Sequence, residues 1–349
     1  MKPPPGTNLK NLFFVKLLSI IRATATLFAT AAITSCDAVY EDLDPCEPNP
    51  SGVDVKLVYD RNLPGGDAFA KSVHCATLHL FNEQGRYIGS FPCEGNMVSI
   101  DLPAGRYHAI AYGGMSCTDA SYKFASVPSE VSHYNELQTV LTDTRAPGEW
   151  TGKLHPHFHA NADITVADTE GHSQMAMSLT KNTNNLRVVL QHDDGSAVDP
   201  DDFEFYITAD NSTMAHDNSV VKTGNDVIYR NWTSGTIPMG FIVNETQDET
   251  KPVIDAYAEI HFGRMDTKAD SPVLHVRRKQ GEKEIINVPL TTYFRMIKSK
   301  ELEELSLQDY LDMQDQWSII FNLDSDTQEW IGFTIKINDW IVNILDFDF

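Results

Sequence analysis

The stretch Val53–Tyr59 (VDVKLVY) carries the clearest secondary-structure signal in this chain of 349 residues. Apolar side chains occupy every second position of it, at Val53, Val55, Leu57 and Tyr59. Successive side chains of a β-strand point to opposite faces of the sheet, so this period of two predicts a strand with one buried face.

The same alternation recurs along the chain, and residues typical of turns separate the alternating runs. The runs lie at 76–81, 98–102, 107–111, 186–190, 203–207, 256–262, 273–277 and 284–290. The short connection Pro103-Ala104-Gly105 predicts that runs 98–102 and 107–111 form a hairpin. So many short alternating strands predict an all-β protein.

The last fifty residues interrupt this pattern once. Ser306-Leu307-Gln308-Asp309 has the form of a helix capping box, and leucines recur near it at helical spacing, which predicts one or two short helices between Ile297 and Gln316. The runs Trp317–Leu323 and Trp330–Leu345 then predict a terminal hairpin.

The alternation weakens between residues 143 and 171, where prolines and glycines interrupt it. A hydrophobic content of 42% supports a sizeable core, and the length is typical of two domains. We therefore predict one domain at 53–165 and a second, with the short helices, at 166–349.

The amino-terminal segment has the pattern of a bacterial lipoprotein signal. Four basic residues and a short apolar run lead to Ile33-Thr34-Ser35-Cys36, and an acidic, proline-rich stretch follows at 36–52. The interpretation is that residues 1–35 are removed, that Cys36 carries diacylglycerol and an N-acyl chain such as palmitate, and that 36–52 is a linker. The alternative is an ordinary cleaved signal that leaves Cys36 unmodified.

The chain is strongly acidic, with a net charge of −22, which becomes −26 once residues 1–35 are removed. Nucleic acids are bound through clustered Lys and Arg, so an acidic surface excludes them as partners. The negative net charge of the chain also provides no attraction to an anionic lipid surface. Any attachment to a membrane must therefore come from the lipid.

Four cysteines remain after Cys36, namely Cys46, Cys75, Cys93 and Cys117. An even number in an oxidising compartment predicts disulfides, and three pairings are open. None of these cysteines has the C-x-x-C spacing of a zinc site, so we expect no metal or redox role for them.

Two clusters have residue types that bind metals. His155, His157 and His159 alternate, but Pro156 and the lack of a nearby carboxylate favour a solvated linker. The acidic loop 193–202 lacks the ligand spacing of an EF-hand. The sequence contains neither a nucleophile elbow nor a P-loop, so we expect no metal, no other cofactor and no enzymatic activity.

Aromatic residues offer a different kind of site. Trp317, Trp330, Trp340 and Tyr112 are candidates for a platform that stacks against sugars. Each tryptophan lies in an alternating apolar run, however, and such a position favours packing in the core.

A set of short strings, in order along nearly the whole mature chain, resembles the FimB/Mfa2 family of fimbrial anchor lipoproteins. The strings are Ser35-Cys36-Asp37, Tyr40–Leu43, Pro45-Cys46, Val55–Asp60, Asp67-Ala68-Phe69, Leu102–Tyr107, Ala111–Gly114, Leu179–Asn184, Gln308–Asp312 and Ile335–Trp340.

The resemblance implies two transthyretin-like β-sandwich domains and a lipid on Cys36. It implies a surface-exposed, lipid-anchored place at the base of a fimbria, on the outer membrane of a Bacteroidales-type bacterium. The implied function is to hold the fimbrial shaft to the cell and to limit the length of the shaft. The implied partners are pilin subunits, bound by β-strand addition, in which main-chain hydrogen bonds provide the affinity.

The resemblance also draws attention to Arg61, just beyond the Val53–Tyr59 strand. In related pilins, proteolysis after an arginine removes a strand of the first domain. Cleavage after Arg61 would cut the folded domain from Cys36, so we predict that an anchor keeps this bond; otherwise Arg61 is an exposed loop residue.

Two other functions fit the same sequence. A fimbrial tip or stalk subunit, which meets ligands on host or bacterial surfaces, shares the architecture, and it would begin at Asn62 after cleavage. A glycan-binding surface lipoprotein would use the aromatic platform.

Overall fold

The computed structural model describes residues 49–142, 148–244, 249–337 and 340–344. The chain divides into two units, Met1–Asn49 and Pro50–Phe349, and the second contains the folded core described below. The predicted signal segment 1–35, Cys36, Cys46 and nearly all of the predicted linker 36–52 lie outside the described residues. The first strand begins at Ser51, within the last two residues of that linker.

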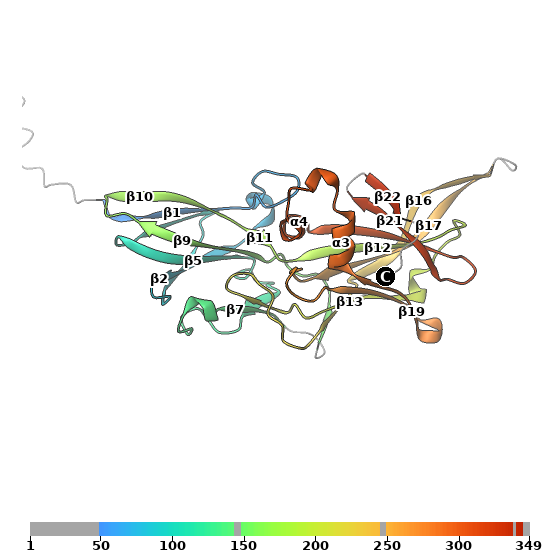
Figure 1. The fold of residues 1–349 in the computed structure, drawn as a ribbon, viewed down its shortest axis with the longest axis horizontal. Coiled ribbons are helices and arrows are strands. Elements are labelled where there is room, and N and C mark those ends of the chain that lie inside the picture. The colour runs from blue at the N-terminus through green and yellow to red at the C-terminus, as the bar shows by residue number, and fades with distance from the viewer. Residues whose placement is uncertain (1–48, 143–147, 245–248, 338–339, 345–349) are drawn as a thin grey trace, which may run out of the picture. The chain divides into compact units, whose positions relative to one another are not determined.

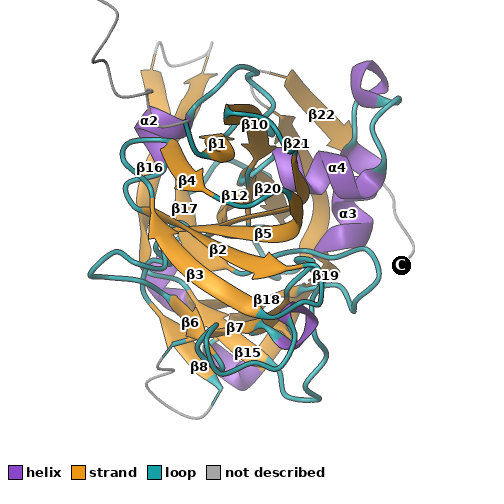
Figure 2. Cartoon of the chain, turned by 90° about the vertical axis from the view of Figure 1, so that its left-hand side faces the viewer, coloured by secondary structure: helices purple, strands orange, loops and turns teal. Residues whose placement is uncertain are grey.

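The first sandwich has two sheets. The smaller has the order β10 (Gly171–Ser178), β1 (Ser51–Val58), β4 (Met97–Asp101), and the larger β11 (Thr180–Lys181), β9 (Phe158–Val166), β5 (Gly105–Gly113), β2 (Ala76–Asn82), β3 (Tyr87–Pro92). Figure 2 shows β3, β2 and β5 side by side. The alternating side chains of both sheets meet in one core, which also contains Phe69 of the short helix α2 (Phe69–Ser72).

The predicted hairpin of runs 98–102 and 107–111 is wrong, although both runs are strands. β4 pairs with β1, whereas β5 pairs with β2 and β9. Because Ile100 and Ala109 both belong to the same buried core, the connection 102–104 carries the chain from one sheet across to the other. Alternation alone does not distinguish these arrangements, since either one buries the same side chains.

A small third sheet, β14 (Thr213–Ala215), β7 (Gln138–Leu141) and β6 (Tyr122–Phe124), covers the outer face of β2 and β5. The 3-10 turn Tyr134–Glu136 belongs to the same cover. Between them a separate cluster buries Phe81, Ile110, Tyr112 and Leu137. Both faces of the β2–β5 pair are therefore buried in this region.

The second sandwich is larger. One sheet has the order β16 (Thr233–Asn244), β17 (Glu249–Phe262), β12 (Asn184–His192), β20 (Gln316–Leu323), β21 (Trp330–Ile337), β22 (Trp340–Ile344). The other has the order β19 (Lys283–Pro289), β18 (Val273–Arg278), β13 (Phe203–Ala209), β15 (Val227–Arg230), β8 (Glu149–Thr151). The predicted pairing of the last two runs is confirmed, because β20 and β21 are antiparallel neighbours.

Two short helices, α3 (Leu290–Ile297) and α4 (Leu307–Met313), pack on this core through Phe294 and Tyr310, among others. Short 3-10 turns lie at Pro200–Asp202, Gln280–Glu282 and Lys300–Leu302. The predicted cap of α4 is confirmed: Ser306 Oγ accepts the N–H of Asp309 at 3.1 Å. The sequence pattern did not predict α3, which follows directly after β19.

The all-β prediction with short helices in the second part is confirmed. The two sandwiches exchange short strands, because β8 joins the second sandwich and β14 joins the cover of the first. Beyond residue 165, β10 and β11 still belong to the sheets of the first sandwich. The transthyretin-like topology and the domain division at 165 and 166 stay predictions.

Candidate functional site: the first strand and its junction with α4

β1 is the middle strand of its sheet. It pairs in parallel with β10 from Ser51 to Val58 and antiparallel with β4 from Gly52 to Lys56. Val53, Val55 and Leu57 are at most 1% exposed, and burying each of them contributes about 1.5–3 kcal/mol. The place that a donated strand would need between β10 and β4 is therefore filled by the chain itself.

One histidine on the outer face of this sheet links all three strands. The Nδ1 atom of His172 on β10 lies 2.8 Å from Asp54 Oδ1 on β1, and its Nε2 atom lies 2.8 Å from Asp101 Oδ1 on β4. Hydrogen bonds to Asp54 and to Asp101 raise the pKa of His172. Hydrogen bonds from Ser99 and then His172 lower the pKa of Asp54. The bridge is thus favoured in its ionised form.

The loop after β1 is held by hydrogen bonds. Asp67 Oδ1 accepts the N–H groups of Tyr59 and Phe69, at 3.0 and 2.9 Å. The buried Asn62 donates through Nδ2 to the carbonyl oxygen of Tyr59 at 2.8 Å. The N–H of Leu63 donates to the carbonyl oxygen of Met313, at the end of α4, at 3.0 Å. The loop is thereby attached to the second sandwich.

Arg61 lies in this loop, where it forms ion pairs. Its Nη2 atom lies 2.8 Å from Asp309 Oδ1 and 3.6 Å from Asp312 Oδ2, both on α4. The Arg61 side chain is 36% exposed, so Arg61 is a partly exposed loop residue that is also paired with α4. Whether the bond after Arg61 is cut stays a prediction.

Asp312 also forms a buried ion pair with Arg264, from the loop after β17. Nη1 of Arg264 lies 2.7 Å from Oδ1 of Asp312 and Nη2 lies 3.0 Å from Oδ2, and the two side chains are 9% and 8% exposed. Nη1 also donates to Asn182 Oδ1 at 3.2 Å, and Asn182 exchanges hydrogen bonds with Asn218. These contacts form a buried polar network where the two sandwiches meet.

The histidine run is partly inside this network, so the solvated-linker interpretation is wrong for two of its members. His157 and His159 are 2% and 4% exposed, and only His155 is exposed. Asn182 Nδ2 lies 3.1 Å from His157 Nδ1, and His159 Nε2 lies 2.8 Å from the carbonyl oxygen of His216. The sequence pattern did not predict this burial, because β9 begins inside the run, at Phe158, and its first residues pack against Tyr112.

No group of His, Cys, Asp or Glu in the described ranges is arranged to hold a metal ion. In the acidic loop, Asp194 accepts the N–H of Ser196 and Asp199 accepts the N–H of Asp201, so these carboxylates stabilise turns. Nor does any helix of the described part have the length and apolar character needed to cross a membrane.

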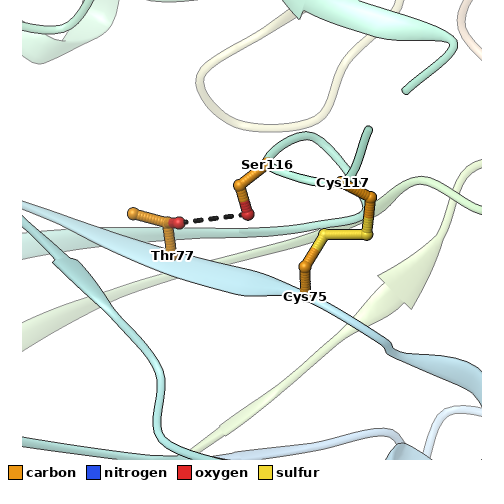
Figure 3. The surroundings of a disulfide bond; sticks show 4 residues. All are labelled: Cys75, Thr77, Ser116 and Cys117. Atoms are coloured by element: carbon orange, nitrogen blue, oxygen red, sulfur yellow. Dashed lines mark hydrogen bonds between the residues drawn. A yellow bond between two sulfur atoms is a disulfide. The ribbon is translucent and has the colours of Figure 1, made fainter. Parts of the chain in front are cut away.

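The cysteines are only partly paired in the described part of the chain. Cys75 and Cys117 form a disulfide with 5.7 Å between their Cα atoms (Figure 3). It joins the start of β2 to the loop after β5, where Ser116 and Thr77 also share a hydrogen bond at 3.4 Å. Cys93 is a free, half-buried thiol whose pKa burial raises to about 11. The bond between Cys75 and Cys117, which occurs in one of the three open pairings, is thus present, and Cys46 lies outside the described residues.

The aromatic platform loses two of its four candidates. Trp317 is 5% exposed, stacks on Phe294 at 3.8 Å, and donates to Asn184 Oδ1 at 3.0 Å. Tyr112 is 2% exposed beneath the small third sheet. Trp330 is half-buried, and the side chain of Trp340 lies outside the described residues. The glycan-binding alternative therefore has little support from these residues.

Comparison with known proteins identifies the family. The model of the fimbrillin-A associated anchor proteins Mfa1 and Mfa2 matches residues 43–346. The chain belongs to this family. As a member of the Mfa2 family it has a role in fimbriae at the cell surface, with fimbrial subunits as its partners. A search among curated proteins found no match.

Solved structures agree with the Mfa2 assignment. A candidate adhesin of Bacteroides thetaiotaomicron is 38% identical, with a TM-score of 0.75, over 87% of this chain and 100% of that one. A candidate polysaccharide-binding protein of the same species is 23% identical, with a TM-score of 0.70, over 85% and 99% of the chains. The fimbrial anchor protein Mfa2 of Porphyromonas gingivalis is 16% identical, with a TM-score of 0.61, over 84% and 99%. The last two share the fold.

Breaking the buried ion pair is expected to destabilise the protein strongly. Replacing Asp312 by Asn leaves the Arg264 guanidinium buried without its counter-charge, which should lower the free energy of unfolding by about 3–5 kcal/mol. Urea denaturation at pH 7 measures this. Glu204→Gln is the matched control, because the pair of Glu204 with Arg277 is about one-third exposed and should contribute at most about 1 kcal/mol. Equal decreases in the free energy of unfolding of the two variants would contradict the assignment of Asp312 and Arg264 as a buried ion pair.

The buried histidines predict a stability that falls in acid. Burial lowers the pKa of His79 to about 4 and of His157 and His159 to about 3. Between pH 6.5 and 4 the unfolded chain binds protons that the folded chain excludes, so the free energy of unfolding decreases as the pH falls, by up to about 1.4 kcal/mol per pH unit for each histidine.

Denaturation at pH 7 and pH 5 measures this loss. His79→Gln removes one of the three titrating groups and should reduce the difference between the two pH values. His74→Gln alters an exposed histidine and should leave the difference unchanged. An undiminished difference in the His79 variant would show that other groups cause the acid sensitivity.

Proposed function

We propose that this Mfa2-family chain is a lipid-tethered anchor, which holds a fimbrial shaft to the outer membrane and limits its length. Lipid on Cys36 attaches the chain, the linker 36–52 spaces it from the membrane, and a pilin binds at a sheet edge by β-strand addition. The proposal includes no catalytic turnover and no cofactor other than the covalent lipid.

The single observation that carries this proposal is the position of β1. The chain between Cys36 and the folded core leads directly into this strand, whose apolar side chains are buried between its two neighbours. A subunit that opens its first sandwich to a donated strand must lose β1 and, with it, the link to Cys36. A subunit that keeps β1 keeps its lipid, which is what an anchor requires.

The tip or stalk subunit is the alternative, and the amino terminus of surface material separates the two. A chain that begins at Asn62 has lost β1 and Cys36, whereas an anchor has a blocked, acylated Cys36. For the anchor, strand addition has to use an edge that β1 leaves free. In the described part of the chain, edge strands of the first sandwich are β3, β4, β10 and β11, and those of the second sandwich are β8, β16, β19 and β22.

The lipid part of the proposal is tested by labelling cells with palmitate. We expect the unchanged chain to be labelled and to fractionate with the outer membrane, together with its pilin. Cys36→Ala should be unlabelled, and its fimbriae should be shed into the medium. Cys93→Ala is the control, because it removes a thiol of the fold and leaves the signal intact. An unlabelled native chain would overturn the proposal.

The pairing of Arg61 predicts resistance to proteases that cut after arginine. Such a protease has to bind the guanidinium, which the native loop engages with Asp309. In limited digestion of the folded mature chain with trypsin, the bond after Arg61 should survive after exposed sites are cut.

Asp309→Asn should speed cleavage at this bond by up to about fivefold, since a half-exposed pair contributes at most about 1 kcal/mol. Asp270→Asn is the matched control, because it weakens an exposed ion pair with Lys222 in the second sandwich. Mass spectrometry of the fragments identifies the cut. Rapid cleavage of the unaltered chain after Arg61 would favour the tip or stalk alternative.

A further inference from the structure

We propose that the sheet β10-β1-β4 is a shear clamp, which bears tension that enters the chain at the amino-terminal end of β1. The inference rests on the proposed function, in which lipid on Cys36 and a bound fimbria pull on the chain from opposite sides. It concerns how the fold resists that pull, which is a separate property from being lipidated.

The direction of β1 sets the direction of the load. The chain enters β1 at Ser51 and leaves it at Val58, and the loop that follows is bonded to α4 by Leu63 and Arg61. The carboxyl end of β1 thus points to the second sandwich and its amino end points away from it (Figure 1). Tension between Cys36 and a subunit held on the second sandwich acts along β1, toward its amino end.

The pairing of β1 suits a load along its axis. Neighbours lie on both sides, with β10 along the whole strand and β4 along Gly52–Lys56. Ladder hydrogen bonds run across the strands, so a pull along the axis strains all of them together. A pull at right angles would open them one at a time. The strand is therefore loaded in the direction in which its bonds act jointly.

The side chains oppose sliding on both faces of the sheet. On the inner face, Val53, Val55 and Leu57 would have to leave the core. On the outer face, the His172 ring is held by Asp54 and Asp101 at 2.8 Å each. A Cβ at Gly52 would overlap Nε2 of His172 and the carbonyl oxygen of Ile100, so only glycine leaves room for this ring. Moving β1 by one residue would break the bridge.

Single-molecule pulling tests the clamp in two geometries. Handles are attached to the non-lipidated mature chain through bioorthogonal side chains, one at the exposed Asp326 in the β20–β21 turn. The other handle is placed either at the amino terminus, which loads β1, or at the exposed Asp60, which bypasses it. We expect the first unfolding event to need a clearly higher force with the amino-terminal handle. Equal forces in the two geometries would overturn the proposal.

His172→Gln tests the bridge that His172 forms with Asp54 and Asp101. It removes a charge-assisted hydrogen bond, so with the amino-terminal handle it should raise the unfolding rate under load about tenfold. With the Asp60 handle the substitution should not change the unfolding rate under load. The matched control is His275→Gln, which breaks a comparable surface bridge to Glu284 on β18 and β19 and should leave the first event unaltered.

The comparison of geometries uses the unaltered chain, so it is decisive even if the His172 variant does not fold. The experiment contains no lipid and no pilin. Failure of the clamp would therefore leave palmitate labelling intact, and failure of the labelling would leave the clamp intact.

Discussion

The burial of one face of β1 is the constraint on which the first sandwich depends. Val53, Val55 and Leu57 form part of its core, and both neighbouring strands form their ladders with this one strand. If β1 leaves, the core opens along its length and the facing edges of β10 and β4 lose their partner. The same strand connects the fold to Cys36, so under the proposed lipid tether the integrity of the sandwich and the attachment of the chain depend on one segment.

The junction with the second sandwich adds a different kind of interaction. Two charges are buried there, and each needs the other, because a buried guanidinium without a carboxylate is costly. Asp312 satisfies Arg264, contacts Arg61, and accepts a hydrogen bond from Gln308 at 2.8 Å. Polar groups in such a network require particular partners in a particular geometry, whereas apolar surfaces tolerate sliding. The network thus fixes the loop after β1 against α4.

Much of the fold could be predicted from the sequence, because its strands alternate clearly between buried and exposed side chains. Long-range pairing could not be predicted. The connection 102–104 looked like a hairpin turn, yet it crosses between sheets, and both arrangements bury Ile100 and Ala109 equally well. β9 was not predicted because His159, Asn161 and Asp163 interrupt its apolar side chains and because Pro156 lies two residues before its start.

The candidate site was predictable only at its ends. The signal before Cys36 and the strand beginning at Val53 are local patterns, so the sequence alone indicates them. The pairing of Arg61 with Asp309 joins positions 248 residues apart, and the link of His172 to Asp54 joins positions 118 apart. Local periodicity does not indicate which residues so far apart in the sequence come into contact. Contacts of this kind follow from the topology, and the topology had to be known first.

The acidic composition bears on how Arg61 is held. Acidic residues outnumber Lys and Arg by 49 to 27, so carboxylates exceed the basic side chains that can pair with them. Arg61, Arg187, Arg230, Arg264 and Arg277 all form ion pairs in the described part of the chain. An arginine that signals cleavage has to be accessible to a protease, and pairing opposes that. At Arg61 the surplus of acid therefore favours a paired side chain and, with it, an uncut bond between β1 and the rest of the fold.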